Sequence, residues 1–194
     1  MIVLTGKTAS GKDTIAYKLL LKYPLLKRVI TTTSRIPRKD ETNGKDYYFL
    51  TREEFNEKIK NGEFAEYVGY GGNLYGTFKK ELEQALISDT LWRIDPSRAG
   101  EVREFIKRTF PSGEAQDLIQ RVVVIYITTA DKVILERLKN RGLSESEIIK
   151  RMNDDNKIWQ KYSQKYDFVV ENAPGRLDQT LNKIISILGS NPRG

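Results

Sequence analysis

The stretch Gly6-Lys7-Thr8-Ala9-Ser10-Gly11-Lys12 decides the fold, because it has the pattern G-x-x-x-x-G-K of a phosphate-binding loop. The apolar residues 2–5 precede it and predict a buried strand, and residues 12–22 follow with apolar side chains at helical spacing. In such a loop the backbone N–H groups and the helix N-terminus attract phosphate oxygens, and Lys12 adds a full positive charge. A strand-to-helix turn without a ligand is the alternative, but strand, loop and helix in register favour phosphate binding. The predicted phosphate-binding residues are Gly6, Lys7, Thr8, Ala9, Ser10, Gly11, Lys12, Asp13 and Thr14.

Position 13 departs from the usual pattern, because it holds Asp where a Ser or Thr hydroxyl ordinarily binds Mg²⁺. A carboxylate could bind the cation directly or through water, although it also brings negative charge close to the phosphates. Asp13 is equally compatible with a purely electrostatic role at the helix N-terminus. We therefore predict Asp13 as the Mg²⁺ ligand and keep the electrostatic role as the open alternative.

Apolar runs alternate with amphipathic stretches along the chain, and this order predicts a parallel sheet covered by helices. Residues 122–127 are apolar at every position and are expected to be buried on both faces. Between about residues 32 and 88 the composition changes to Thr, Arg, Gly and Tyr, which indicates a small, partly β insertion. Residues 96–108 are expected to form one helix and residues 109–119 a mobile loop. Predicted helix N-caps are Thr51, Thr77, Thr129 and Ser144.

The composition narrows the chemistry, because the 194 residues contain no cysteine and no histidine. Disulfides, thiol nucleophiles, Ser-His-Asp triads and histidine-bound metals are thereby excluded. Phosphoryl transfer suits the remaining residue types, since it depends on positioning and on charge stabilisation. The formal net charge of +7 agrees with anionic partners. Apolar runs are too short to span a membrane, and no basic secretory leader is present, so we expect a cytoplasmic protein.

A second group of cations lies at Thr31-Thr32-Thr33-Ser34-Arg35-Ile36-Pro37-Arg38, followed by Glu41, Gly44, Asp46 and Tyr47. Two arginines three positions apart, beside several hydroxyl groups, suit an anion that accepts many hydrogen bonds. A solvated basic loop is the alternative for the arginine pair taken alone.

Together with Gly62–Tyr67 and Gly72–Thr77, this run closely resembles the guanylate kinase family in order and spacing. In that family an arginine pair and two tyrosines hold the phosphate of GMP, while an acid and a hydroxyl recognise guanine. The resemblance implies that Thr31, Arg35, Arg38, Tyr47 and Tyr75 bind the GMP phosphate. It further implies that Glu66, Thr77 and Asp95 bind the base.

The resemblance continues through residues 136–152, which are similar to the family's mobile lid, and covers residues 1–188 in outline. It implies that Arg141 and Arg151 close on the transferring phosphoryl group and, with Lys12 and Arg38, form the catalytic set. Arg137 would lie against ATP, and Asn172 would border its adenine. The implied organisation is a P-loop NTPase-type parallel sheet with a core at 1–31 and 89–188. A mixed α/β GMP-binding insertion at about 32–88, a helical lid at about 136–155 and a flexible tail at 189–194 complete it.

The chain also departs from the family at Arg93, where the family commonly has an acid. We hypothesise that Asp13 compensates for that missing carboxylate. The segment 109–120 is longer than the corresponding segment of the family, and Asp40 stands where the family has glycine. Residues 173–175, after Asn172, are Ala-Pro-Gly. These changes mark a divergent member of the family.

The resemblance implies an enzyme that transfers the γ-phosphoryl group of ATP to GMP or dGMP with Mg²⁺, giving ADP and the diphosphate. The alternatives are a related kinase for a deoxynucleotide or a sugar phosphate, and a catalytically silent binding module of the same fold. We expect small-molecule substrates, a monomer or homodimer, and neither a membrane nor a nucleic acid as partner, because no nucleic-acid-binding motif is present.

Overall fold

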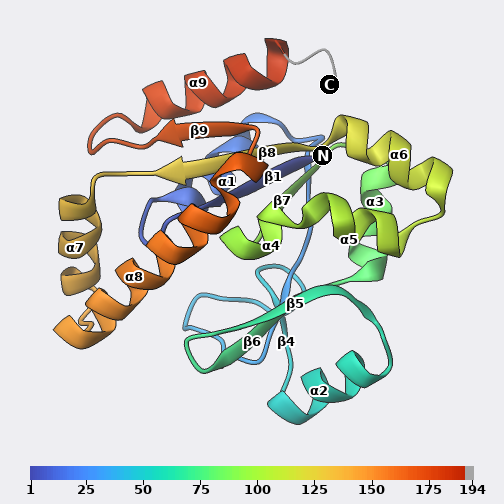
Figure 1. Cartoon of the computed structure of the whole chain (residues 1–194), viewed down its shortest axis with the longest axis horizontal. Coiled ribbons are helices and arrows are strands. Elements are labelled where there is room, and N and C mark those ends of the chain that lie inside the picture. The colour runs from blue at the N-terminus through green and yellow to red at the C-terminus, as the bar shows by residue number, and fades with distance from the viewer. Residues whose placement is uncertain (191–194) are drawn as a thin grey trace.

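A five-stranded parallel sheet forms the centre of the molecule, with helices on both faces (Figure 1). The computed structural model describes residues 1–190. The strand order is β2-β7-β1-β8-β9, so the first strand lies in the middle of the sheet. The strands are β1 (Ile2–Gly6), β2 (Lys27–Arg28), β7 (Thr90–Arg93), β8 (Val123–Thr128) and β9 (Phe168–Glu171). Because ligands of open parallel sheets bind beyond the carboxyl ends of the strands, the loop after β1 lies at the expected edge.

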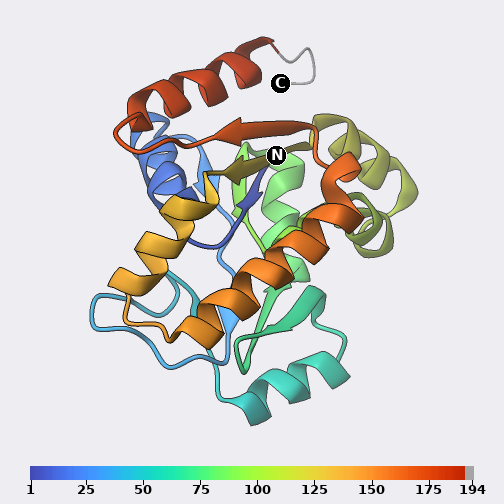
Figure 2. The ribbon, with the colours of Figure 1, turned by 60° about the vertical axis from the view of Figure 1, so that its left-hand side comes forward.

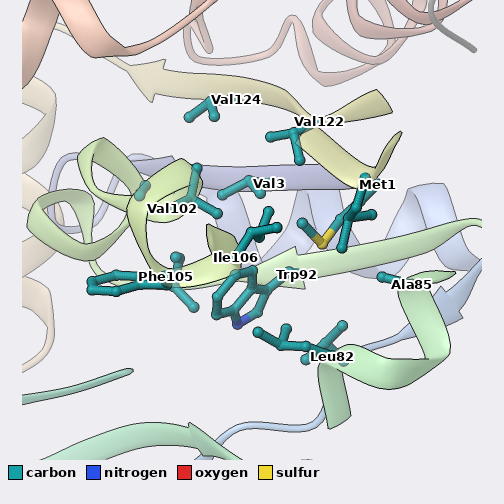
Figure 3. Packing of buried hydrophobic residues seen from close by; sticks show 14 of the residues in the cluster. Met1, Val3, Leu82, Ala85, Trp92, Val102, Phe105, Ile106, Val122 and Val124 are labelled. Atoms are coloured by element: carbon teal, nitrogen blue, oxygen red, sulfur yellow. The ribbon is translucent and has the colours of Figure 1, made fainter. Parts of the chain in front are cut away.

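Strand β8 shows why the sheet is buried on both sides. Val123, Ile125 and Ile127 pack with helices α1 (Lys12–Lys22) and α9 (Leu177–Ser190). Val124 and Tyr126 belong to a different cluster, which includes Trp92 and residues of several helices. Figure 3 shows Val124 and Trp92 in this cluster. Alternation with a period of two sends successive side chains to opposite faces. The prediction of a strand buried on both faces is confirmed.

Six helices cover the second face and the carboxyl edge of the sheet. They are α3 (Lys79–Ile87), α4 (Pro96–Gly100), α5 (Val102–Thr109), α6 (Ser112–Arg121), α7 (Asp131–Asn140) and α8 (Glu145–Tyr162), the last followed by a short 3₁₀ turn, η1 (Ser163–Lys165). Figure 2 shows α7 and α8 standing together beside the sheet edge. None of the helices in residues 1–190 is both long enough and apolar enough to cross a bilayer.

Two predictions about helices are wrong. Residues 96–108 form two helices, because the chain leaves helical geometry at Glu101. Residues 109–119 are not a loop, since α6 begins at Ser112, directly after Pro111. Proline is compatible with a helix start, and burial of Ala115 and Leu118 against the core outweighs the low helix propensity of the nearby glycine.

The predicted caps divide into two pairs. Thr51 and Ser144 form complete capping boxes at the starts of α2 (Arg52–Lys60) and α8, as predicted. Thr77 and Thr129 cap nothing, because α3 and α7 begin one residue later and both threonine side chains are buried. The predicted tail is also wrong in part, since α9 continues through Ser190, and residues 191–194 lie outside the described residues.

A second sheet lies within the predicted insertion and has its own small core. Its strand order is β4-β3-β6-β5, with β3 (Thr32–Thr33), β4 (Tyr48–Phe49), β5 (Phe64–Tyr70) and β6 (Asn73–Phe78). Phe55 of α2 stacks on Phe64 with ring centroids 4.4 Å apart, and Phe64 stacks on Phe78 at 4.6 Å. This aromatic stack holds α2 on the sheet, and it includes none of the residues that form the main core clusters.

We predict that Phe55→Ala lowers the free energy of unfolding by about 3–5 kcal/mol, because the fully buried ring leaves a cavity and its stacking partner is lost. Urea denaturation followed by circular dichroism measures this change. The control is Ile87→Ala, whose side chain is 86% exposed and which should alter the free energy by no more than about 0.5 kcal/mol. Equal effects of the two substitutions would contradict the assignment of Phe55 as the centre of this core.

Candidate active site

The loop at residues 6–12 turns away from β1 under a strict steric constraint. Gly6 has a φ of 150°, and a Cβ atom at this position would overlap the backbone carbonyl of Ile127 in β8. Gly11 has a φ of 89° and lies directly before α1. The Lys7 N–H donates to the Ile127 carbonyl at 3.1 Å, which fixes the turn to the sheet. The predicted strand-loop-helix arrangement is confirmed, and phosphate binding by this loop stays a prediction.

Residues from distant segments hold the loop from behind. Ala9 is in the left-handed region, with a φ of 53°, and its methyl group packs among side chains of α7 and α8. The Arg137 guanidinium donates to the Ala9 carbonyl at 2.8 Å, and the Asn172 amide donates to the Ser10 carbonyl at 2.8 Å. Arg137 and Asn172 therefore lie at the loop, where the resemblance placed them. With Gly11, Thr14 and Arg141 they border a cavity beside the start of α1.

Asp155 of α8 is a site residue that the sequence prediction missed. The backbone N–H of Thr8 donates to its carboxylate at 2.8 Å, and the side chain is buried. Burial raises the pKa of Asp155, opposed by the Thr8 N–H and by Lys12. A signal was present in the sequence, because Asp155 follows Arg151 by four positions and such residues share one face of a helix.

One cavity joins the phosphate loop to the predicted acceptor site. On the loop side it is lined by Gly6, Thr8, Lys12 and Asp13. On the other side it is lined by Thr31, Tyr47, Glu66, Tyr75 and Asp95. An adjoining cavity is bordered by Arg35, Arg38, Arg141 and Arg151, together with Asp13, Tyr47 and Tyr75. The structure thus brings together residues from the phosphate loop, the predicted insertion and the predicted lid. Lys7 is an exception, because its ammonium group pairs with Asp131 at 2.7 Å.

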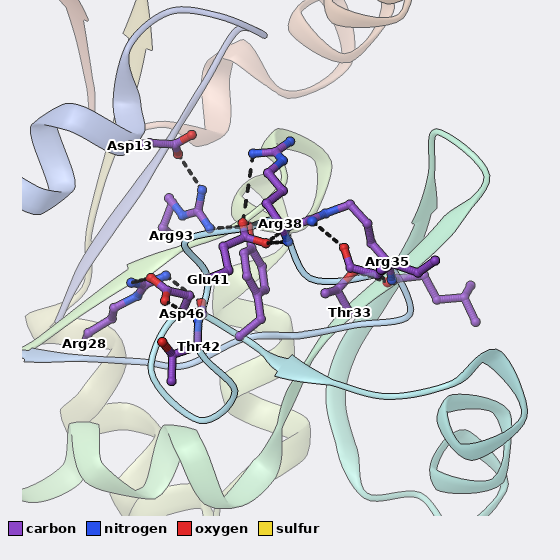
Figure 4. Close-up of polar contacts among 12 residues, drawn as sticks. Asp13, Arg28, Thr33, Arg35, Arg38, Glu41, Thr42, Asp46 and Arg93 are labelled. Atoms are coloured by element: carbon purple, nitrogen blue, oxygen red, sulfur yellow. Dashed lines mark hydrogen bonds and ion pairs between the residues drawn. The ribbon is translucent and has the colours of Figure 1, made fainter.

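The arginine pair is organised by Glu41, which the sequence prediction did not place in the site. Both carboxylate oxygens of Glu41 accept from the Arg35 guanidinium at 2.8 Å, and one also accepts from the Arg38 backbone N–H (Figure 4). Arg35 is thereby held in place, whereas the Arg38 side chain is 77% exposed. Guanidinium groups form strong charge-assisted hydrogen bonds with anions, so this pair suits an anionic ligand.

A buried hydrogen-bond chain supports the predicted base-recognising carboxylate. The Trp92 indole N–H donates to the Thr77 hydroxyl at 3.0 Å, and the Thr77 hydroxyl donates to Glu66 at 2.6 Å. An indole only donates, so the Thr77 oxygen must accept from it and direct its own hydrogen to Glu66. Burial raises the pKa of Glu66 to about 7, against the opposing effect of the Thr77 hydrogen bond. Thr77 is fully buried and supports Glu66 through this hydrogen bond. No pattern in the sequence pointed to Trp92.

Asp95 has a local structural role besides its place at the cavity. It caps the start of α4, where its carboxylate accepts from the Ser97 N–H at 2.8 Å and from the Ser97 hydroxyl at 2.6 Å. One oxygen, Oδ1, accepts both bonds, which hold the carboxylate in one orientation.

The two unusual positions of the sequence, Asp13 and Arg93, are in direct contact. The Arg93 guanidinium donates to the Asp13 carboxylate at 2.5 Å and also donates to the Tyr47 hydroxyl. Desolvation acts to raise the pKa of Asp13, but Arg93 and Lys12 outweigh it and lower the pKa to about 2. Asp13 is therefore ionised, and its nearest partner is a cation from β7.

We predict that Thr77→Val raises the pKa of Glu66 above 7 by about one to two pH units, because the charge-assisted hydrogen bond to the ionised carboxylate is lost. Carboxyl ¹³C NMR titration measures this value. Thr77→Ser keeps the hydroxyl and should keep the pKa of Glu66 near that of the unmodified protein. The same pKa in the valine and serine variants would contradict the hydrogen-bond chain.

Comparison with known proteins agrees with this geometry. The sequence profile of the family described as guanylate kinase matches residues 1–191. The guanylate kinase of Fusobacterium nucleatum subsp. nucleatum is 34% identical over 189 residues, which cover 97% of this chain and 95% of that protein. The guanylate kinase of Synechocystis sp. is 33% identical over 190 residues, covering 97% and 93%. A crystal structure of guanylate kinase from Anaplasma phagocytophilum superposes with a TM-score of 0.69 at 26% identity, covering 98% of this chain and 84% of that one.

Proposed function

The chain belongs to the guanylate kinase family, and we propose that it transfers the γ-phosphoryl group of ATP to GMP, giving ADP and GDP. The observation that carries this proposal is the shared cavity, which is lined by Lys12 of the phosphate loop and by Glu66 of the insertion. Donor and acceptor phosphates bound at these two ends would meet between them. Positioning of this kind supplies much of the rate in phosphoryl transfer.

Recognition of guanine rests on Glu66. An ionised carboxylate accepts from the N1–H and the 2-amino group of guanine, whereas adenine presents no such pair of donors. One oxygen of Glu66 accepts from Thr77, and the carboxylate lines the cavity with acceptor capacity left for the two guanine donors. Asp95 lines the same cavity, and Thr31, Arg35, Arg38, Tyr47 and Tyr75 are proposed to bind the acceptor phosphate.

The transfer step needs no protein nucleophile. An oxygen of the GMP phosphate forms a bond to the γ-phosphorus, while the bond from that phosphorus to the β–γ bridging oxygen breaks and its electrons leave with ADP. Lys12 neutralises the donor phosphates, and Arg38, Arg141 and Arg151 are proposed to stabilise the charge on the transferring group. All three arginines border one cavity in the structure.

A divalent cation would bind at this site together with the nucleotide, held by the protein and by the phosphates. Within residues 1–190 no group of three or more acidic side chains could hold a metal ion by itself. Asp13 offers the carboxylate oxygen that does not bond to Arg93, and Mg²⁺ is commonly held by one carboxylate together with substrate phosphates and water. We propose Mg²⁺ as the cation and Asp13 as its protein ligand. When bound, it would neutralise charge on the phosphates of ATP.

We further propose that three units move relative to one another during the reaction. They are the core (1–31 and 89–188), the insertion (about 32–88) and the lid (about 136–155). Lid closure would exclude water and so prevent hydrolysis of ATP. We propose that the protein acts in the cytoplasm as a monomer or homodimer.

The activity is tested by incubating the purified chain with ATP and Mg²⁺ and each of GMP, dGMP, AMP, UMP, CMP and dTMP. We expect GDP from GMP and dGDP from dGMP, because among these bases only guanine offers the Glu66 carboxylate an N1–H and a 2-amino group. Lys12→Ala should lower kcat on the order of 10²-fold, since a cation at the developing charge is lost. A product from a different acceptor would assign another kinase activity, and GMP binding without any product would assign a silent binding module.

We predict that GMP binding weakens as the pH falls through about 7, because protonation of Glu66 removes the acceptor for the two guanine donors. Isothermal titration calorimetry between pH 8 and 5.5 measures the dissociation constant. The control is Glu66→Gln, which cannot titrate. Since the GMP phosphate titrates near pH 6 with either protein, the difference between their pH profiles isolates Glu66. Parallel profiles would exclude Glu66 as the recognising group.

A further inference from the structure

Arg93 occupies an unusual place between the two predicted phosphate sites. It is the last residue of β7, and its side chain is only 18% exposed. One nitrogen of its guanidinium donates to Asp13, which directly follows Lys12, and another donates to the Tyr47 hydroxyl. Asp13 belongs to the donor side and Tyr47 to the acceptor side. Figure 4 shows Asp13 and Arg93 facing each other across this gap.

Arg93 borders both cavities of the site. It lines the cavity that contains Lys12 and Glu66, and it also lines the cavity of the arginine cluster. A guanidinium is a planar fork with five N–H donors, so it is able to bind two anionic groups at once. Its partners are one carboxylate and one hydroxyl, and the Asp13 side chain is 67% exposed. These contacts leave part of its donor capacity for phosphate oxygens.

The charges around Arg93 also favour added anions. The cavity of the arginine cluster is lined by six arginines and three carboxylates: Arg28, Arg35, Arg38, Arg93, Arg141 and Arg151, with Asp13, Glu41 and Asp46. Cations therefore outnumber carboxylates around this cavity. Grouping like charges in this way is unfavourable unless anions balance them. The phosphates of two nucleotides would supply that balance.

We propose that Arg93 binds substrate phosphate at the junction of the two sites, contacting the acceptor phosphate beside Tyr47 and the transferring phosphoryl group beside Asp13. This inference rests on the proposed function. While the acceptor oxygen bonds to the γ-phosphorus and the bond to the β–γ bridging oxygen breaks, Arg93 donates hydrogen bonds to non-bridging oxygens and transfers no proton. Arg93 then joins the catalytic arginines. Like Arg28 of β2, which borders the arginine cavity, it comes from a strand of the main sheet.

A simpler role would be neutralisation of Asp13 alone. In that case Arg93 would protect the phosphates from the Asp13 carboxylate without touching them. The two roles differ when both residues are replaced, because removing Asp13 makes its neutralisation unnecessary. If Arg93 binds phosphate, the double variant would still lack that hydrogen-bond donor and would bind GMP weakly.

The test compares the binding of GMP and of guanosine by calorimetry, without ATP or a divalent cation, for wild type, Arg93→Met, Asp13→Asn and the double variant. We expect Arg93→Met to weaken GMP binding by about 10- to 100-fold, as for lost hydrogen bonds to a charged group. The dissociation constant of guanosine should change by no more than about twofold, or about 0.4 kcal/mol, because guanosine has no phosphate for Arg93 to bind. The double variant should bind GMP as weakly as Arg93→Met. Recovery of wild-type affinity in the double variant would overturn the proposal.

Turnover provides the second measurement. Arg93→Met should lower kcat for GDP formation by at least about tenfold, and Arg93→Lys should recover part of the loss because it restores the charge without the fork. The control is Arg103→Met, which removes an ion pair with Asp167 near the amino end of β8, the edge of the sheet opposite the cleft, and should leave turnover unchanged. Thermal melting confirms folding, and Arg93→Gln replaces the methionine variant if that one does not fold.

Failure of the inference is distinguishable from failure of the proposed function. Wild-type protein that neither binds nor phosphorylates GMP would refute the function itself. Wild-type protein that phosphorylates GMP, with Arg93→Met and Arg93→Gln binding GMP and turning over within about twofold of wild type, would refute the role of Arg93 alone.

Discussion

The tight turn after β1 is the constraint on which the rest of the site depends. A loop that bends at Gly6 leaves backbone N–H and C=O groups pointing away from any regular strand or helix, and such groups need partners. The partners come from β8, α7, α8 and the segment after β9, through the carbonyl of Ile127 and the side chains of Arg137, Asp155 and Asn172. In the structure these contacts attach the predicted lid and the sheet to the loop.

Charge is the second organising principle. Two arginines of the cleft pair with carboxylates, Arg93 with Asp13 and Arg35 with Glu41. These pairs orient the guanidinium groups. Charge-assisted hydrogen bonds to phosphate are about as strong as those to carboxylate, so exchange of one for the other costs little. Six arginines and three carboxylates border one cavity of the cleft, which therefore carries an excess of positive charge.

The proposed base pocket balances burial against ionisation. Burial disfavours the charged form of Glu66, yet the proposed recognition of two guanine donors requires that form. The hydrogen-bond chain from Trp92 through Thr77 to Glu66 stabilises the ionised carboxylate. Asp155 is a similar case. Burial raises its pKa, and the hydrogen bond from the Thr8 N–H acts in the opposite direction.

The sequence by itself determined the local elements: the phosphate loop between its strand and helix, the strand 122–127 buried on both faces, and the capping boxes at Thr51 and Ser144. These follow from periodicity and backbone geometry over a few residues. Through the resemblance it also indicated which side chains line the cleft. Only the tertiary structure decided that Asp13 meets Arg93, 80 positions away, and that Thr8 meets Asp155, 147 positions away. Such contacts depend on strand order and helix packing, which no short stretch of sequence encodes.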